Sequence, residues 1–184
     1  AKFFSTSRRS AELIKYASNA FLATKITFIN ELANLCEKSN INVEEVSLGM
    51  GSDVRIGSRF LRAGPAYGGS CFPKDTKGLI STGNKYNIDL SIVKSVVKSN
   101  NNRISLHIKR IDQIVGNNFK NKKIAFLGVT FKPNTDDMRD STSLHMIPYV
   151  SKKGAMVTYY DPTGVKKELM KIKNCFYKKN IQEP

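Results

Sequence analysis

The segment AELIKYASNAFLATKITFINELANLCEK, residues 11–38, sets the fold of the first half of this 184-residue chain. It contains no glycine or proline, Ser10 is a suitable N-cap, and Glu12 would complement the helix dipole in the first turn. The pattern predicts one helix, roughly 40 Å long at about 1.5 Å per residue. Because its apolar residues fall on most faces, we expect the helix to be buried inside a domain or at a subunit interface.

The rest of the first half is also predicted to be mainly helical. Asn42 and Glu45 have the spacing of a capping box and predict a short helix over VEEVSLGM, residues 43–50. The glycine-rich stretch 51–75 is predicted to be a loop region. Further helices are predicted over residues 76–86 and 90–115.

The pattern changes at residue 122. KKIAFLGVTF, residues 122–131, has two lysines, a continuous apolar run and a glycine, which indicates a buried parallel strand. A polar loop, a helix over 143–154 that contains Pro148, and a second strand over 155–162 follow. This β-loop-α-β order predicts an open α/β sheet of about two strands.

The basic composition indicates mainly a solvated surface; small anionic substrates and an acidic remainder of the protein outside this sequence both stay open. The net charge is +15, but the basic residues are scattered, with no basic heptad helix, zinc-ligand spacing or aromatic RNA motif. We therefore expect no nucleic-acid partner and no metal. The sequence has no apolar run of membrane-spanning length, and we expect no membrane association. Three irregularly spaced cysteines and the lack of a secretory signal predict a cytoplasmic, reducing location.

YGGSCFPKD, residues 67–75, places one cysteine among turn-forming residues. A lone cysteine usually packs as a small apolar residue, and Cys36 and Cys175 fit that interpretation. Cys71 fits it less well, since a thiol on a loop near a cation can act as a nucleophile.

Three polar residues around these segments have both a structural and a functional interpretation. Lys15 and Asn19 share one helix face, either as part of a surface stripe or, as their apolar neighbours predict, as buried functional groups. Asp75 is either at or near a helix N-cap or a carboxylate that orients a water molecule beside the thiol.

Three motifs carry a family resemblance: AELIKYASNAFLATKITFINELANLCE, RIGSRFLRAGPAYGGSCFPKD and LGVTFKPNTDDMRDSTS. In this order they resemble the UDP-glucose 6-dehydrogenases of the UDP-glucose/GDP-mannose dehydrogenase family. The resemblance implies a mainly α central dimerisation domain, residues 1–118, and a truncated α/β Rossmann-like UDP-binding domain, residues 119–184. It further implies a homodimer through the helix at 11–38, NAD as cofactor, and oxidation of UDP-glucose to UDP-glucuronate through a thiohemiacetal and thioester.

The resemblance also implies a role for individual residues. Cys71 matches the nucleophile, Lys15 and Asn19 match the groups that stabilise the oxyanion, and Asp75 matches the aspartate that assists proton transfer and the hydrolytic water. Arg55 matches an arginine that reaches substrate across the dimer. The other implied contacts are Phe60, Leu61, Tyr67, Gly68 and Lys132 for substrate, and Arg139 for the cofactor.

One expected motif is missing from the printed sequence, which contains no G-x-G-x-x-G. The family places this dinucleotide fingerprint ahead of the long helix. We therefore expect this chain to be a fragment that is inactive alone. Two alternatives remain: a related GDP-mannose or UDP-amino-sugar dehydrogenase, and a non-catalytic sugar-nucleotide-binding dimerisation core.

Overall fold

The computed structural model describes residues 3–116 and 118–181, which form two compact units. The first unit comprises Ala1–Gly64 and Cys71–Asn100, and the second comprises Pro65–Ser70 and Asn101–Pro184. The first is helical and the second is α/β, which confirms the predicted fold class. The predicted domain boundary between residues 118 and 119 stays a prediction.

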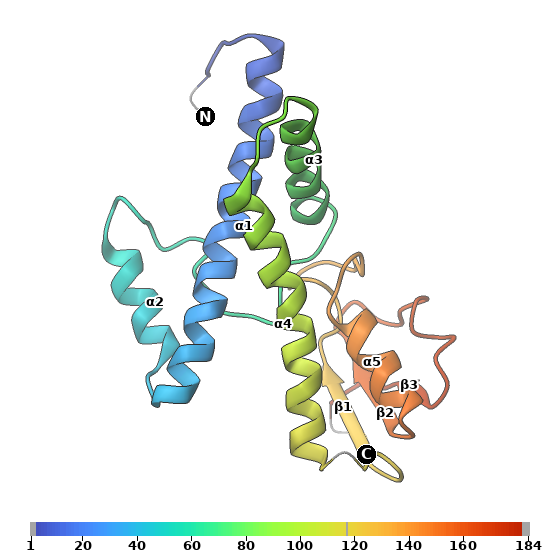
Figure 1. Ribbon diagram of the computed structural model, residues 1–184. Helices are drawn as coiled ribbons and strands as arrows, with labels where there is room; N and C mark the ends of the chain where they lie inside the picture. Colours follow the sequence, from blue (N-terminus) through green and yellow to red (C-terminus); the bar gives the residue numbers. More distant parts are fainter. Residues whose placement is uncertain (1–2, 117, 182–184) are drawn as a thin grey trace. The chain divides into compact units, whose positions relative to one another are not determined.

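The first unit is built around one long helix (Figure 1). Its elements are α1 (Arg8–Ser39), α2 (Val43–Ser52), α3 (Phe72–Lys85) and the first part of α4 (Ser91–Val115). Helix α3 lies beside the N-terminal half of α1, where Gly78 of α3 faces the ring of Tyr16. This contact matters for the site, because α1 and α3 carry its polar groups.

Helix α1 begins three residues before the predicted start. Ser7, not Ser10, is the N-cap, and its hydroxyl accepts the backbone N–H of Ser10 at 3.2 Å. The predicted cap at Ser10 and the first-turn position of Glu12 are therefore wrong, because the capping serine lies upstream of the apolar pattern. At the other end Asn40 adopts a left-handed conformation, with φ of 55°.

Within this chain α1 is buried on one side only. Its buried residues are Ala20, Ala23, Thr27, Ile29, Asn30 and Cys36. Four large exposed apolar residues recur every seven positions and form one stripe along the helix. We call Ile14, Phe21, Phe28 and Leu35 the α1 stripe. The other helices of the unit leave this side uncovered, so of the two predicted settings, burial inside the domain does not account for the α1 stripe and burial at a subunit interface stays a prediction.

The short connections carry the other capping residues. Asn42 caps α2 as predicted, but its side chain accepts the backbone N–H of Glu44 at 2.9 Å and not that of Glu45, the partner in the predicted capping box. Helix α3 begins at Phe72, four residues before the predicted start. Pro73 is tolerated in its first turn because the N–H groups there have no partner within the helix. Cys71 becomes the N-cap, and Asp75, predicted at or near that position, lies inside the helix.

The second unit contains a three-stranded parallel sheet. Its elements are β1 (Lys123–Leu127), α5 (Ser143–Lys152), β2 (Met156–Tyr160) and β3 (Cys175–Tyr177), with strand order β1-β2-β3. The third strand was not predicted individually. The parallel pairing of β1 with β2 is as predicted, but full burial of β1 is wrong. In the described sheet β1 is an edge strand, so its side chains alternate between exposed and half-buried.

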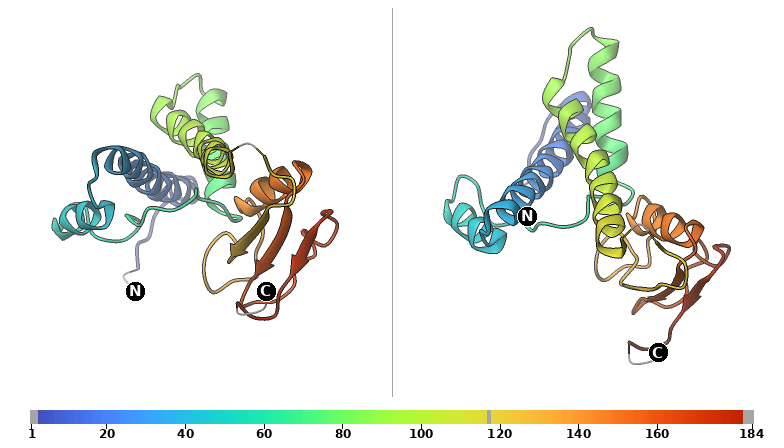
Figure 2. Two further views of the ribbon diagram at one scale, coloured as in Figure 1. Left: turned by 90° about the horizontal axis from the view of Figure 1, so that it is seen from below. Right: turned by 60° about the horizontal axis from the view of Figure 1, so that its bottom comes forward.

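Helix α5 packs on one face of the sheet (Figure 2). Ile147 and Val150 of α5 and Val157 of β2 are fully buried in the core. The last turns of α4 contribute Ile111 and Val115 to the edge of this core. Pro148 lies inside α5, as predicted.

The segment 65–70 belongs to the second unit although it lies far from the rest of it in sequence. The backbone N–H of Gly69 donates to the carbonyl oxygen of Arg139 at 2.7 Å. Gly69 has φ of +80°, and a Cβ there would lie 2.6 Å from the Phe131 ring. A Cβ on Gly68 would lie 2.3 Å from the carbonyl oxygen of Asp140. Both positions therefore require glycine, which allows the close backbone approach.

Candidate functional site

Helices α1 and α3 bring three of the predicted catalytic residues together. Asn19 Nδ2 donates to Asp75 Oδ2 at 2.6 Å, and Lys15 Nζ lies 3.6 Å from the same oxygen. Asp75 is completely buried, whereas the Lys15 side chain is 61% exposed. The predicted burial of Lys15 is therefore wrong, because α3 covers the carboxylate and leaves the ammonium group at the surface.

Asp75 is a buried carboxylate with three donors around it. The third is Lys74 Nζ, which donates to Oδ1 at 2.7 Å. Burial raises the pKa of Asp75, but the hydrogen bonds from Lys74 and Asn19 and the charge of Lys15 outweigh it, so the pKa lies below its ordinary value. The carboxylate is therefore ionised at neutral pH and is a weak base, well suited to orienting the groups that contact it.

Cys71 is exposed at the N-terminus of α3. Its carbonyl oxygen accepts the first helical hydrogen bond, from the backbone N–H of Asp75 at 2.8 Å. The positive end of the helix dipole favours negative charge at this position. Cys36 is buried, as predicted, and Cys175 is half-buried in β3. The interpretation of Cys71 as a buried packing residue is therefore excluded.

Sequence reasoning missed Lys74 and Tyr16. Lys74 has a raised pKa, first because of its hydrogen bond to Asp75, and the charge of Cys71 contributes in the same direction. Its ammonium group lies 5.9 Å from the centre of the Tyr16 ring, and that of Lys15 lies 5.8 Å from the same centre. The signal for Lys74 was a lysine directly before an aspartate in the first turn of a helix, three residues after Cys71 and two after Phe72.

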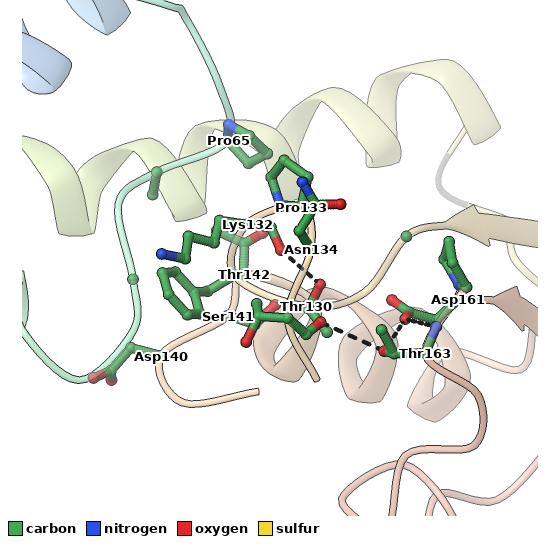
Figure 3. Close-up of a pocket in the computed structure, with 16 residues that line it drawn as sticks. Pro65, Thr130, Lys132, Pro133, Asn134, Asp140, Ser141, Thr142, Asp161 and Thr163 are labelled. Atoms are coloured by element: carbon green, nitrogen blue, oxygen red, sulfur yellow. Dashed lines mark hydrogen bonds between the residues drawn. The ribbon is translucent and has the colours of Figure 1, made fainter. Parts of the chain in front are cut away.

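The second unit has a cleft of about 450 Å³ at the carboxyl ends of β1 and β2 (Figure 3). Asp161 and Thr163 lie at one end of it, and Lys132 and Pro65 lie toward the other. The lining comes from segment 65–70 and from residues 128, 130–135, 140–142 and 161–163. Ligands of open parallel sheets bind at this edge, where the loops after successive strands meet.

One end of the cleft is held by a buried ion pair between Asp161 and Lys166. Asp161 accepts the backbone N–H of Val129 at 3.0 Å and lies 3.3 Å from Lys166 Nζ. Burial raises the pKa of Asp161, but hydrogen bonds from Thr163 and Val129 lower it to about 2. Because its oxygens are engaged by these protein donors, Asp161 fixes the loops after β1 and β2.

The other predicted contacts fall in both units. Of the expected substrate contacts, Gly68 and Lys132 line the cleft. Tyr67, the residue before Gly68, is buried and does not line it. In the first unit Leu61 is buried, and the ring of Phe60 packs edge-on against Phe72 with 6.0 Å between centres.

Phe60, Arg55 and Arg139 have constrained local geometry. Phe60 has φ of 66°, a left-handed conformation that is uncommon for a bulky residue and concentrates at functional sites. Arg55 and Arg139 are exposed, and each is paired with an aspartate two residues before it. None of these contacts shows a role by itself. The roles of all the site residues stay predictions.

Comparison with known proteins agrees with both units. Residues 9–102 match the UDP-glucose/GDP-mannose dehydrogenase family, central domain, and residues 125–183 match the UDP binding domain of that family. Among curated proteins, the UDP-glucose 6-dehydrogenase of Rhizobium meliloti is 52% identical over 160 residues, which cover 87% of this chain and 37% of the relative. UDP-glucose 6-dehydrogenase YwqF of Bacillus subtilis is 47% identical, over 98% of this chain and 41% of the relative.

A solved structure has the same fold. The UDP-glucose dehydrogenase of the archaeon Pyrobaculum islandicum superposes with a TM-score of 0.87 at 34% identity, covering 95% of this chain and 40% of that one. The chain thus spans about two fifths of the length of the relatives that it matches. With both family domains matched in order, this chain belongs to the UDP-glucose/GDP-mannose dehydrogenase family.

Proposed function

We propose that this chain supplies the nucleophile and the oxyanion-stabilising groups for the NAD-dependent oxidation of UDP-glucose to UDP-glucuronate. The observation that carries the proposal is the buried Asp75 carboxylate. Its oxygens contact Asn19 and Lys15 of α1. The helix that carries Asp75, α3, begins directly after the exposed Cys71. Groups of this kind are needed when a carbonyl carbon is attacked and its oxygen becomes negatively charged.

The proposed covalent step takes place at the aldehyde stage of the reaction. The Cys71 sulfur bonds to C6 of the sugar, the C=O double bond becomes single, and the oxygen takes the electron pair. The Lys15 ammonium has three N–H donors and the Asn19 amide has two. Each residue directs one of them to Asp75. The remaining donors can bind the oxyanion without breaking the contacts to Asp75.

Asp75 is best suited to an orienting role in this scheme. Its lowered pKa makes it a poor acceptor for a proton at neutral pH, whereas its two oxygens fix three donors at once. Lys74 is a cation at neutral pH, and the hydrogen bond to Asp75 raises its pKa further, so it adds a positive charge to this cluster. The attacking species in a step of this kind is a thiolate.

NAD would accept the hydride in each oxidation. The described residues do not form a glycine cradle for a dinucleotide: Gly128 follows β1, but the next three residues are Val129, Thr130 and Phe131. The expected contact of Arg139 with NAD stays a proposal.

The cleft of the second unit is proposed to bind the UDP group. The match to the family's UDP binding domain over residues 125–183 supports this, as does the position of the cleft at the carboxyl ends of the strands. Lys132 at its edge offers a cation for phosphate, and the hydroxyls of Ser141 and Thr142 line it at the start of α5. A helix N-terminus favours an anion.

We further propose a homodimer through α1. The α1 stripe is a seven-residue repeat of large apolar side chains on one exposed side of a long helix. A second copy of the same stripe is its simplest cover, because two identical faces related by a two-fold axis bury each other.

Alkylation of the isolated chain tests the covalent step. The probe is the 6-aldehyde of UDP-glucose, and iodoacetamide labelling of each cysteine is then followed by mass spectrometry. We expect the aldehyde to protect Cys71, while the half-buried Cys175 reacts as before and the buried Cys36 stays unlabelled. UDP-glucose is the matched control, because it fills the same site but has no carbonyl group at C6.

The outcome separates the proposal from its alternatives. Equal protection by UDP-glucose and the aldehyde would support a non-catalytic sugar-nucleotide-binding core. No protection by either compound would contradict the proposed site. Repeating the assay with the GDP-mannose and UDP-amino-sugar aldehydes would decide which sugar nucleotide is preferred.

A further inference from the structure

The ring of Tyr16 lies beside both lysines of the candidate site. Its centre is 5.8 Å from Lys15 Nζ and 5.9 Å from Lys74 Nζ, and both distances fall within the range of cation–π attraction. Lys15 precedes Tyr16 on α1, whereas Lys74 belongs to α3. One ring therefore lies close to ammonium groups from both helices that form the site.

The contact of Lys15 with this ring does not follow from their being neighbours in sequence. Consecutive residues of an α-helix point about 100° apart around its axis, so their side chains do not face each other. The long Lys15 side chain therefore lies across the helix surface toward the ring and toward Asp75 of α3. The ring and the carboxylate together define where the Lys15 ammonium is held.

Asp75 alone restrains Lys15 weakly. Lys15 Nζ lies 3.6 Å from Asp75 Oδ2, and the same oxygen already accepts from Asn19 at 2.6 Å. Lys74 Nζ lies closer to its own oxygen, 2.7 Å from Oδ1. Both lysine side chains are mostly exposed, and their two positive charges repel each other while they share one carboxylate. Without a second restraint, Lys15 would sample many rotamers in water.

The Tyr16 ring is well placed to be that second restraint. Tyr16 is half-buried, and its ring faces α3 at Gly78, where an added Cβ would lie 3.4 Å from Cε1. Gly78 is four residues after Lys74, so the two positions share one face of α3. Because a tyrosine side chain has only two torsion angles, it offers a contact surface at a low cost in conformational entropy.

We propose that Tyr16 is a positioning residue whose ring holds the Lys15 ammonium beside Asp75, oriented for the oxyanion, and keeps Lys74 next to it. The inference rests on the proposed function, because it needs Lys15 as an oxyanion donor. It assigns the effect to the aromatic ring and not to the hydroxyl group. It also predicts a selective loss. Without the ring, an aldehyde should be captured less well, whereas UDP-glucose, which forms no oxyanion, should bind as before.

Three variants of the 184-residue chain isolate the contribution of the ring. Tyr16→Leu keeps an apolar side chain but removes the π face, and Tyr16→Phe keeps the ring without the hydroxyl. Tyr86→Leu is the matched control, because it removes a tyrosine that is 68% exposed at the opposite end of α3 from Lys74. Circular dichroism melting of each variant checks that the fold is kept.

The first measurement observes the lysines directly by nuclear magnetic resonance. The chain is made with isotope-labelled lysine, and the side-chain signals of Lys15 and Lys74 are assigned from their loss in Lys15→Arg and Lys74→Arg. Because a nearby aromatic ring shifts such signals, both should move in Tyr16→Leu and stay near their positions in Tyr16→Phe. Neither should move in Tyr86→Leu.

The second measurement reports on the oxyanion. For each variant, the concentration of UDP-glucose 6-aldehyde that half-protects Cys71 from iodoacetamide is compared with the affinity for UDP-glucose from isothermal titration calorimetry. Tyr16→Leu should raise the half-protecting concentration about 2–10-fold, through the freedom that Lys15 regains, and should leave the affinity for UDP-glucose unchanged. Tyr16→Phe should lie within about twofold of the unchanged chain. Lys15→Ala, assayed in the same way, sets the full loss.

The outcomes separate this inference from the proposed function. If Lys15→Ala captures the aldehyde as readily as the unchanged chain does, Lys15 is not an oxyanion donor, and both fall together. If Lys15→Ala captures it poorly but Tyr16→Leu does not, or if the lysine signals are the same with and without the ring, the proposed function stands and the positioning role is overturned. Equal losses of aldehyde capture and UDP-glucose affinity in Tyr16→Leu would also overturn it, because they would show a merely structural role. Selective loss of aldehyde capture, restored in Tyr16→Phe, supports the proposal.

Discussion

Replacing Asp75 with asparagine should destabilise the first unit and should do so in a pH-dependent way. The carboxylate is fully buried and accepts from Asn19 at 2.6 Å and from Lys74 at 2.7 Å. A partly buried hydrogen bond to a charged group contributes roughly 1.5–3 kcal/mol. The Lys74 ammonium is 63% exposed, so solvent screens its attraction to the carboxylate and most of the expected effect comes from the Asn19 hydrogen bond.

In the Asp75→Asn variant the amide oxygen can still accept from Asn19. The amide N–H groups, however, face the Lys74 ammonium, which is itself a donor, so that hydrogen bond is lost. We therefore expect the free energy of unfolding to fall by about 2 kcal/mol at pH 7. Urea unfolding followed by circular dichroism at the helical band measures this fall. Asp89→Asn is the matched control, since its pair with Lys94 is exposed on both sides and should contribute less than about 1 kcal/mol.

The pH dependence provides a second check. The pKa of Asp75 is lowered in the folded protein, so its stabilising contribution is complete above the pKa of the unfolded chain, about 3.9. The contribution is lost as the pH falls through the folded pKa. The difference in the free energy of unfolding between the unchanged chain and Asp75→Asn should therefore persist from pH 7 to about pH 5. It should shrink below about pH 4. Equal midpoints for Asp75→Asn and Asp89→Asn at pH 7 would refute the reasoning.

Three other substitutions test separate parts of the molecule. In an enzyme that joins these residues to a dinucleotide-binding domain, Lys15→Ala should lower the steady-state rate of NADH formation about 10²–10³-fold, as for loss of one oxyanion donor; a drop under threefold would count against that role. Gly69→Ala should lower thermal stability by about 1–3 kcal/mol, because the new Cβ would meet Phe131 at 2.6 Å, and an unchanged melting curve would show that the close approach is dispensable. Phe28→Asp, in the α1 stripe, should convert a dimer to a monomer in light scattering, whereas an unchanged mass would exclude the stripe as the interface.

The long helix and the order of elements could be predicted from sequence because they depend on local patterns. Residues 11–38 contain no helix breaker, and the switch from helical to strand periodicity after residue 122 is sharp. The helix ends were less predictable. Ser7 and Cys71 are the N-caps of α1 and α3. Both lie several residues before the apolar repeat begins, so the repeat alone predicts helix starts that are too late.

The site was predictable as a set of residues but not as a network. Lys15, Asn19 and Asp75 were expected near one another, and α1 and α3 do bring them together. Their exposure was not predictable, since Lys15 has apolar sequence neighbours that themselves lie at the surface. Lys74 was missed because a lysine beside an aspartate is common on helices. Only the tertiary contact shows that this aspartate is buried and shared.

The close packing of Gly68 and Gly69 bears on how the protein could be divided. The second unit is discontinuous in sequence, because segment 65–70 is followed at once by Cys71, which belongs to the first. A polypeptide truncated to residues 119–184 would lack this segment and would leave one face of Phe131 uncovered. Grafting the segment back through a circular permutation should restore that cover. An exchange of the α/β unit between relatives at a single junction would therefore separate Phe131 from the two glycines that pack against it. A chimaera that keeps this packing must exchange both segment 65–70 and the C-terminal part of the unit.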